Sequence, residues 1–184
     1  ATMDGAPLLQ RVSYCYSAPL LNPRTGLSIP VVDSDDETEL LRRVLCHGTA
    51  ARIAFKAVTG SVNNFCDLLH QGCNILHYTG HGLPDGNLAL ENEIGELHSF
   101  HKDKLSALMR CVKFMPKLVV VAACHSQVMG ETFCAAGVRH VIAVRLDSQV
   151  LDKHAISFTK FLYEALLDGS TVREAFDVAN TTMA

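Results

Sequence analysis

A histidine and a cysteine each follow a buried apolar segment of the chain, and together they suggest nucleophilic chemistry. His81 stands between Gly80 and Gly82, directly after the segment ILHYT. Cys124 ends the apolar run LVVVAA and is followed by a polar His-Ser pair. A cysteine acts as a nucleophile when it becomes a thiolate, and a neighbouring imidazole can take its proton. The two residues therefore predict a thiol nucleophile and its general base, provided that the fold brings them together.

The glycine after the histidine predicts a site for a substrate oxyanion. Gly82 has no side chain, so a substrate carbonyl can approach its backbone N–H. The backbone N–H of Cys124 would be the second donor. A histidine or a cysteine alone at the end of a strand is more often a structural residue, so it is their combination that points to catalysis.

The elements that must position these residues alternate between extended and helical, which predicts an α/β fold: an open, mainly parallel sheet with helices on both faces. Strands are expected at 12–21, 52–58, 73–80, 117–124 and 139–146, and a small hairpin at 88–100. Helices are expected at 33–46, where the acids belong to the helix start, from Ser61 to about Gly72, and at 102–111, 130–137, 152–169 and 171–180.

The expected strand ends bring the two reactive residues to one edge. KLVVVAAC is almost entirely apolar, which is typical of a strand buried on both faces. In an open parallel sheet the active crevice lies beyond the carboxyl ends of the strands, where His81 and Cys124 both fall. The chain between them holds the hairpin and one crossover helix, which suits neighbouring strands about 4.8 Å apart.

Composition indicates a globular domain and excludes several classes of function. The chain has 184 residues, of which 48% are hydrophobic and 19% charged, so we expect a single domain over residues 1–184. The net charge of −3 gives no basic face, so nucleic acid is not an expected partner. No apolar run reaches the roughly 18–20 residues that span a bilayer, and no signal peptide opens the chain. Because the sequence begins without Met, we expect a domain excised from a longer protein.

The seven cysteines predict a reduced, cytoplasmic protein. Their number is odd and their spacing irregular, which argues against a disulfide framework. The six cysteines other than Cys124 are expected to be packing residues that behave as small hydrophobic side chains.

Taken in order, the motifs resemble the CHAT domain, a family of caspase-like cysteine peptidases related to separase and the caspases. The resemblance begins with GHG after ILHYT and AACHS after LVVV, and continues through GETFCAAGVRHVIAV, LDKHAISFTKFLYEALLDG and STVREAFDVA. It covers about residues 9–180 and is strongest at 73–83 and 118–180. The fold that it implies is the caspase-like α/β/α sandwich.

The resemblance implies a cysteine endopeptidase that needs no cofactor and no metal. His81 is then the general base, Cys124 the nucleophile that forms a thioester with the substrate acyl group, and the amides of Gly82 and Cys124 the oxyanion hole. The substrate is a protein or peptide, and control comes from an upstream tetratricopeptide-like region or a regulatory partner. Since no spare linker follows the cysteine strand, we expect an enzyme that works as one chain.

The resemblance also suggests a substrate pocket after the last core strand. Relatives that cut after basic residues carry acids there; here Asp152 matches the family's Asp ahead of the long helix, and Asp147 is an additional acid. Gln149 stands where separase carries an Asp. A basic preference is one expectation, and a helix N-cap role for Asp152 is the alternative.

Other classes of site fit the sequence less well. GHGLPDG has one residue too many for a dinucleotide-binding G-x-G-x-x-G and precedes a strand rather than a helix. His77 and His81 lack the glutamate of a helical zinc motif, and His98, His101 and Cys111 are loosely spaced. No G-x-S-x-G elbow is present. The main alternative is a catalytically silent caspase-like module that binds or regulates other proteins.

Overall fold

The computed structural model describes residues 10–32, 34–46, 53–145 and 152–183. Within these ranges, five parallel strands form a sheet in the order β2-β1-β3-β6-β7. These strands are β1 (Gln10–Ser17), β2 (Ile53–Thr59), β3 (Ile75–Gly80), β6 (Leu118–Ala123) and β7 (His140–Arg145). A separate antiparallel hairpin consists of β4 (Leu88–Glu91) and β5 (Leu97–Phe100). The predicted parallel sheet and hairpin are thereby confirmed.

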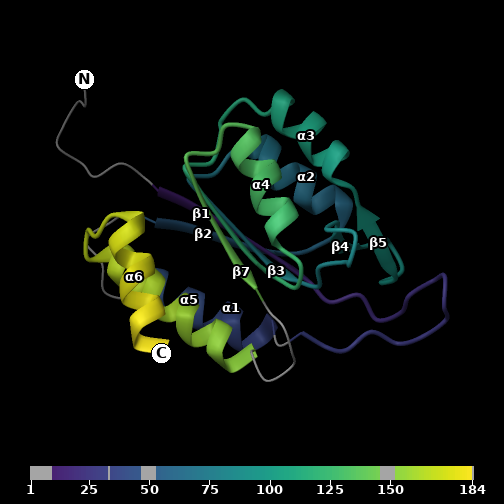
Figure 1. The fold of residues 1–184 in the computed structure, drawn as a ribbon, viewed down its shortest axis with the longest axis horizontal. Helices are drawn as coiled ribbons and strands as arrows, with labels where there is room; N and C mark the ends of the chain where they lie inside the picture. Colours follow the sequence, from purple (N-terminus) through teal and green to yellow (C-terminus); the bar gives the residue numbers. More distant parts are fainter. Residues whose placement is uncertain (1–9, 33, 47–52, 146–151, 184) are drawn as a thin grey trace.

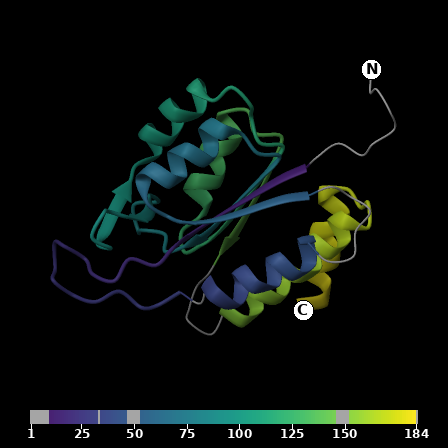
Figure 2. The same cartoon turned by 180° about the vertical axis from the view of Figure 1, so that it is seen from behind.

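Helices cover both faces of the sheet, as the sequence predicts (Figures 1 and 2). One face carries α2 (Val62–Gln71), α3 (Lys102–Cys111) and α4 (Gln127–Ala135). The other face carries α1 (Ser34–Cys46), α5 (Asp152–Leu167) and α6 (Val172–Met183). None of the described helices is both long and apolar enough to cross a bilayer.

The apolar run of β6 divides its side chains between the two helix layers. Leu118 and Val120 join the cluster that contains residues of α5 and α6. Val119, Val121 and Ala123 join the cluster beneath α2, α3 and α4. All six residues of the strand are buried, because helices cover the sheet on both sides and successive side chains point to opposite faces.

Several predicted boundaries were wrong, among them the end of the last helix, which runs to Met183 rather than residue 180. The first strand ends at Ser17 rather than at residue 21, since the backbone N–H of Ala18 donates to Glu91 Oε1 and Leu21 pairs outside the sheet with Ser28 and Glu96. The helix expected at 130–137 begins earlier, at Gln127, which leaves only a short turn after Cys124.

The prediction that six cysteines serve packing was wrong for three of them. Cys15 and Cys73 are buried and Cys66 is partly buried, as expected. Cys46, Cys111 and Cys134 are exposed, because each lies in the last turn of a helix and off its buried stripe.

A buried polar cluster ties two helices to the sheet. Glu37, in the first turn of α1, accepts hydrogen bonds from the hydroxyls of Tyr14 and Thr159, each at 2.9 Å. His77 Nε2 lies 3.6 Å from Glu37 Oε1, and His77 Nδ1 lies 3.2 Å from the Tyr163 hydroxyl. Burial lowers the pKa of His77, against the opposing effect of the Glu37 carboxylate. Glu37 is therefore an internal anchor between α1, α5, β1 and β3, and not only a helix-start acid.

Candidate active site

His81 and Cys124 reach the same edge of the sheet, on neighbouring strands. β3 pairs with β6 in parallel, and the last paired residues are Thr79 and Ala122. His81 and Cys124 each follow two residues later, so they leave the sheet at the same level. The predicted neighbourhood of the two strands is confirmed.

The glycine after His81 is required by contact with Cys124. A Cβ placed on Gly82 would overlap the carbonyl oxygen of Cys124 and contact its carbonyl carbon. Any larger residue would push the two strand ends apart. Gly82 therefore permits a close backbone approach beside the cysteine, which is one of the established uses of glycine.

The hairpin fixes the direction of the Gly82 backbone. Gly82 and Leu88 form an isolated antiparallel bridge. The flanking hydrogen bonds run from Ala89 N to His81 O at 3.1 Å and from Leu83 N to Asn87 O at 2.9 Å. This is the pattern of a non-hydrogen-bonded pair, in which the N–H and C=O of the paired residue point away from the partner strand. The N–H of Gly82 thus points away from β4.

The glycine before His81 is also determined by packing. A Cβ on Gly80 would lie 2.6 Å from the Tyr78 hydroxyl oxygen and 2.8 Å from the carbonyl oxygen of Ser17. That hydroxyl lies 3.2 Å from the carbonyl oxygen of His81 and 2.9 Å from that of Ala89. Neither glycine beside His81 can therefore carry a side chain without a steric clash. The hydroxyl of the buried Tyr78 also donates a hydrogen bond to the His81 carbonyl.

The imidazole of His81 is oriented by a main-chain carbonyl. Its Nε2 lies 2.7 Å from the carbonyl oxygen of Pro30, in the segment between β1 and α1. Because a carbonyl only accepts, Nε2 carries the proton of this hydrogen bond, and in the neutral ring Nδ1 is the basic nitrogen. Sequence analysis missed Pro30, since a backbone acceptor carries no signal in the residue type.

Cys124 lies at a sharp junction between strand and helix. The next residue, His125, is exposed and has a φ of 51°, and it is the one non-glycine residue in the described ranges with a positive φ. Ser126 then occupies the N-cap position of α4. The reversal leaves Cys124 partly buried at the edge of the sheet.

The predicted substrate-pocket acids are not tested by the structure. Asp147 lies outside the described residues. Asp152 is the first residue of α5, and its side chain is likewise outside the part that the structure describes. The acid pocket and the N-cap role both remain predictions.

The zinc alternative gains no support from the geometry. His77 is fully buried against Glu37 and Tyr163, whereas His81 is at the carboxyl edge with Pro30. In the ranges for which the structure gives positions, no three His, Cys, Asp or Glu side chains gather as metal ligands would.

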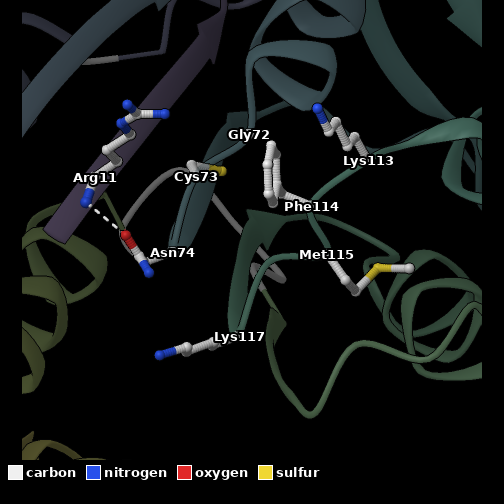
Figure 3. Close-up of a pocket in the computed structure, with 8 residues that line it drawn as sticks. All are labelled: Arg11, Gly72, Cys73, Asn74, Lys113, Phe114, Met115 and Lys117. Atoms are coloured by element: carbon white, nitrogen blue, oxygen red, sulfur yellow. Dashed lines mark hydrogen bonds between the residues drawn. The ribbon is translucent and has the colours of Figure 1, made fainter. Parts of the chain in front are cut away.

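A hollow of about 470 Å³ lies at the opposite, amino-terminal end of the strands (Figure 3). Its rim carries Arg11, Lys113 and Lys117, whose charged ends do not converge in Figure 3. Phe114 packs over Gly72 and is contacted by the Lys113 ammonium at 5.4 Å from the ring centre. This hollow holds none of the predicted site residues, so the carboxyl edge is the better candidate active site.

A parallel sheet between two helix layers, with a histidine and a cysteine at the carboxyl ends of neighbouring strands, defines a caspase-like domain. The family model of the CHAT domain matches residues 26–184, and the chain belongs to this family. CHAT domains are related to the caspase-like cysteine peptidases. The comparison with curated proteins found no match.

Proposed function

We propose that this CHAT domain is a cysteine endopeptidase that cleaves a protein substrate through a His81–Cys124 dyad. The observation that carries the proposal is the position of the two residues at the same level of adjacent strand ends, with Gly82 packed against the Cys124 backbone. The hydrogen bond from His81 Nε2 to Pro30 adds to it, because it leaves Nδ1 as the base.

Acylation uses the histidine first as base and then as acid. His81 takes the proton of the Cys124 thiol, and the sulfur attacks the carbonyl carbon of the scissile bond. The carbonyl oxygen becomes an oxyanion, which the N–H groups of Gly82 and Cys124 stabilise. When the C–N bond breaks, His81 gives its proton to the leaving nitrogen, and the acyl group remains on Cys124 as a thioester.

Deacylation returns the site to its starting state. A water molecule gives a proton to His81 as its oxygen attacks the thioester carbonyl. The C–S bond then breaks, the acid product leaves, and the sulfur recovers its proton from His81. No electron is transferred and no cofactor takes part in either step.

In the same proposal, the carboxylates of Asp147 and Asp152 would line the substrate pocket and favour a basic residue before the cut. An upstream repeat region or a regulatory partner would control access to the site, in the cytoplasm. Only a short connection, residues 136–139, joins α4 to β7, which supports a chain that works without cleavage there.

The test is covalent labelling of the cysteines. The protein is treated briefly with a pool of peptide acyloxymethyl ketones that vary in the residue before the reactive carbon, and intact mass and peptide mapping locate the adduct. We expect one adduct, on Cys124, that is absent in Cys124→Ala and much slower in His81→Ala. Exposed Cys134 provides the matched internal control, because it carries no histidine partner in the proposal.

A cysteine-labelling pattern without a preference for Cys124 would contradict the proposal. Labelling of Cys124 no faster than that of Cys134, and unchanged in His81→Ala, contradicts an assembled dyad. The chain would then be the catalytically silent module, and binding rather than cleavage would be its function.

A further inference from the structure

A groove of about 640 Å³ is lined by the loop that follows His81 and Gly82. One wall is the segment directly after Gly82, with Leu83, Pro84 and Asp85. Arg24, from the segment between β1 and α1, and Leu97 and Ser99 of β5 also line the groove. The groove is thus continuous in sequence with the candidate histidine and oxyanion glycine.

The hairpin shows on which side of Cys124 this groove lies. β4 starts beside Gly82 at the end of β3, and its last residue, Glu91, bridges to Ser61, just past the end of β2. Glu91 also accepts the backbone N–H of Ala18, just past the end of β1. The hairpin therefore crosses the ends of β3, β1 and β2, which is the direction away from β6 and Cys124.

The proposed proton transfer from His81 places the leaving-group half of the substrate on the histidine side of the bond that is cut. After the sulfur has attacked, His81 must protonate the leaving nitrogen, so the residues after the cut extend from the imidazole. The acyl half stays with Cys124, just past the end of β6. The hairpin extends from His81 in the direction away from β6, and its residues Leu97 and Ser99 line the groove.

The lining indicates which side chains would bind. Leu83 and Leu97 are partly exposed apolar side chains that a substrate can cover. The carboxylate of Asp85 already accepts hydrogen bonds from the Asn87 backbone at 3.1 Å and side chain at 2.9 Å. Arg24 is exposed, and no carboxylate of the described residues pairs with its guanidinium. The groove therefore combines two partly exposed apolar side chains with one positive charge, at Arg24, and one negative charge, at Asp85, whose oxygens already accept from Asn87 whereas Arg24 pairs with no carboxylate of the described residues.

We propose that this groove binds the leaving-group half of the substrate and selects an apolar side chain within the first two positions after the cut, followed by an acidic one that meets Arg24. The inference rests on the proposed function and deepens it, because it names the substrate class. Arg24 is its specificity-determining residue, and Leu83 and Leu97 supply the apolar contact.

The experiment uses peptides that share one acyl half, taken from the best-labelling ketone, and differ after the cut. The leaving halves are Ala-Leu-Gly-Glu, Ala-Leu-Gly-Lys and Ala-Gly-Gly-Glu, and kcat/KM is measured for each. We expect the Glu peptide to exceed the Lys peptide by about two- to fivefold, the range of an exposed ion pair. Leu should exceed Gly at the second position by about tenfold, as for a partly buried apolar side chain.

The Arg24 variants should change the ratio of kcat/KM for the Glu peptide to kcat/KM for the Lys peptide, which is called the Glu-to-Lys ratio. Arg24→Glu should invert the Glu-to-Lys ratio, and Arg24→Gln should bring it close to one. Arg173→Glu, at an exposed position of α6, is the matched charge-reversal control and should keep the Glu-to-Lys ratio of the unchanged protein. Because each ratio is taken within one protein, differences in folded fraction cancel.

A coumarin amide with the same acyl half has no residue after the cut. It therefore tests the proposed peptidase activity separately from substrate binding in the groove. If it is cleaved while the three peptides react equally, or if Arg24→Glu keeps the ratio, the groove inference is wrong and the peptidase stands. If neither the coumarin amide nor any peptide is cleaved and Cys124 takes no ketone label, the proposed function is wrong, and the groove inference with it.

Discussion

The α-carbon of Gly82 lies so close to the carbonyl oxygen of Cys124 that no side chain fits between them. This contact joins the ends of β3 and β6 just where the candidate base and nucleophile leave the sheet. The spacing of these two chain segments is therefore set by backbone packing, and it depends on the absence of a side chain at Gly82.

Replacement of that glycine should disable the site. In Gly82→Ala the methyl group forces the strand ends apart, and a displacement of this kind costs about a hundredfold in rate when it separates reacting groups. The measurement is the rate of ketone labelling at Cys124, with thermal unfolding in parallel. Gly137→Ala is the control: its φ of 100° makes the substitution strained, but nothing lies within 4 Å of the added methyl. Labelling of Gly82→Ala at the original rate would refute the steric role.

The Pro30 carbonyl should matter for reactivity more than for stability. Pro30→Gly keeps the carbonyl but frees the backbone, which costs about 0.4–1 kcal/mol of local order. We expect Cys124 labelling to slow by about two- to fivefold, because the imidazole is then held less often in its productive orientation. Pro23→Gly is the matched control, because it lies in the same segment but is not the residue whose carbonyl binds His81, and it should label normally. Equal slowing in both variants would argue against a specific role of Pro30.

The turn after Cys124 should prefer glycine to a β-branched residue at position 125. His125 has a left-handed φ of 51°, a conformation that costs about 1–2 kcal/mol for most residues with a Cβ. Urea denaturation should therefore show His125→Val less stable than His125→Gly by about that amount. His140, in β7, gives the reverse control, since a strand favours valine over glycine. The same order of stability at both positions would contradict the assignment.

The buried histidine should make stability fall in mild acid. Burial lowers the pKa of His77 in the folded protein, whereas an unfolded histidine titrates near pH 6.5. Below about pH 6.5 the unfolded chain binds a proton that the folded one does not, so the free energy of unfolding decreases; above it both states are neutral and this dependence vanishes. The groups that face the ring are Glu37, Tyr14 and Tyr163, and burial raises the pKa of both tyrosines.

Denaturation at pH 7.5 and pH 5.5 measures this effect. The decrease in the free energy of unfolding between the two pH values should be smaller by about 1 kcal/mol in His77→Phe than in the unchanged protein. His70→Gln, at an exposed position of α2, should retain the full decrease. An unchanged decrease in His77→Phe would show that another group is responsible.

The parts of the fold that sequence predicted are those whose signal is local. The apolar run of β6, the hairpin turn and the Ser61 cap all formed where expected, and Ser61 Oγ accepts the N–H of Asn64 at 3.1 Å. The neighbourhood of His81 and Cys124 followed from strand ends in a parallel sheet. These features depend on periodicity, turn chemistry and topology rules, which a single sequence contains.

The parts that sequence missed depend on contacts between distant segments. Glu37 reads as a helix-start acid, and its inward role becomes visible only with Thr159 and His77 beside it. The acceptor of the His81 ring is a carbonyl, which every residue has. Arg24 belongs to a turn-rich segment, and only the structure places it in the same groove as the loop after Gly82. None of these roles is encoded in a neighbouring residue.

The inner positions of β3 and β6 set the order in which the candidate site would open. Each of these strands is paired on both sides, and apart from the partly buried Ile75 all their residues are buried, so their amides are the last to exchange with solvent. Pro30 lies outside the strands and helices, in the segment between β1 and α1. A brief local opening of that segment would release the carbonyl that orients the His81 ring, while the ends of β3 and β6 stay in place. The candidate base would lose its orientation before the candidate nucleophile moves.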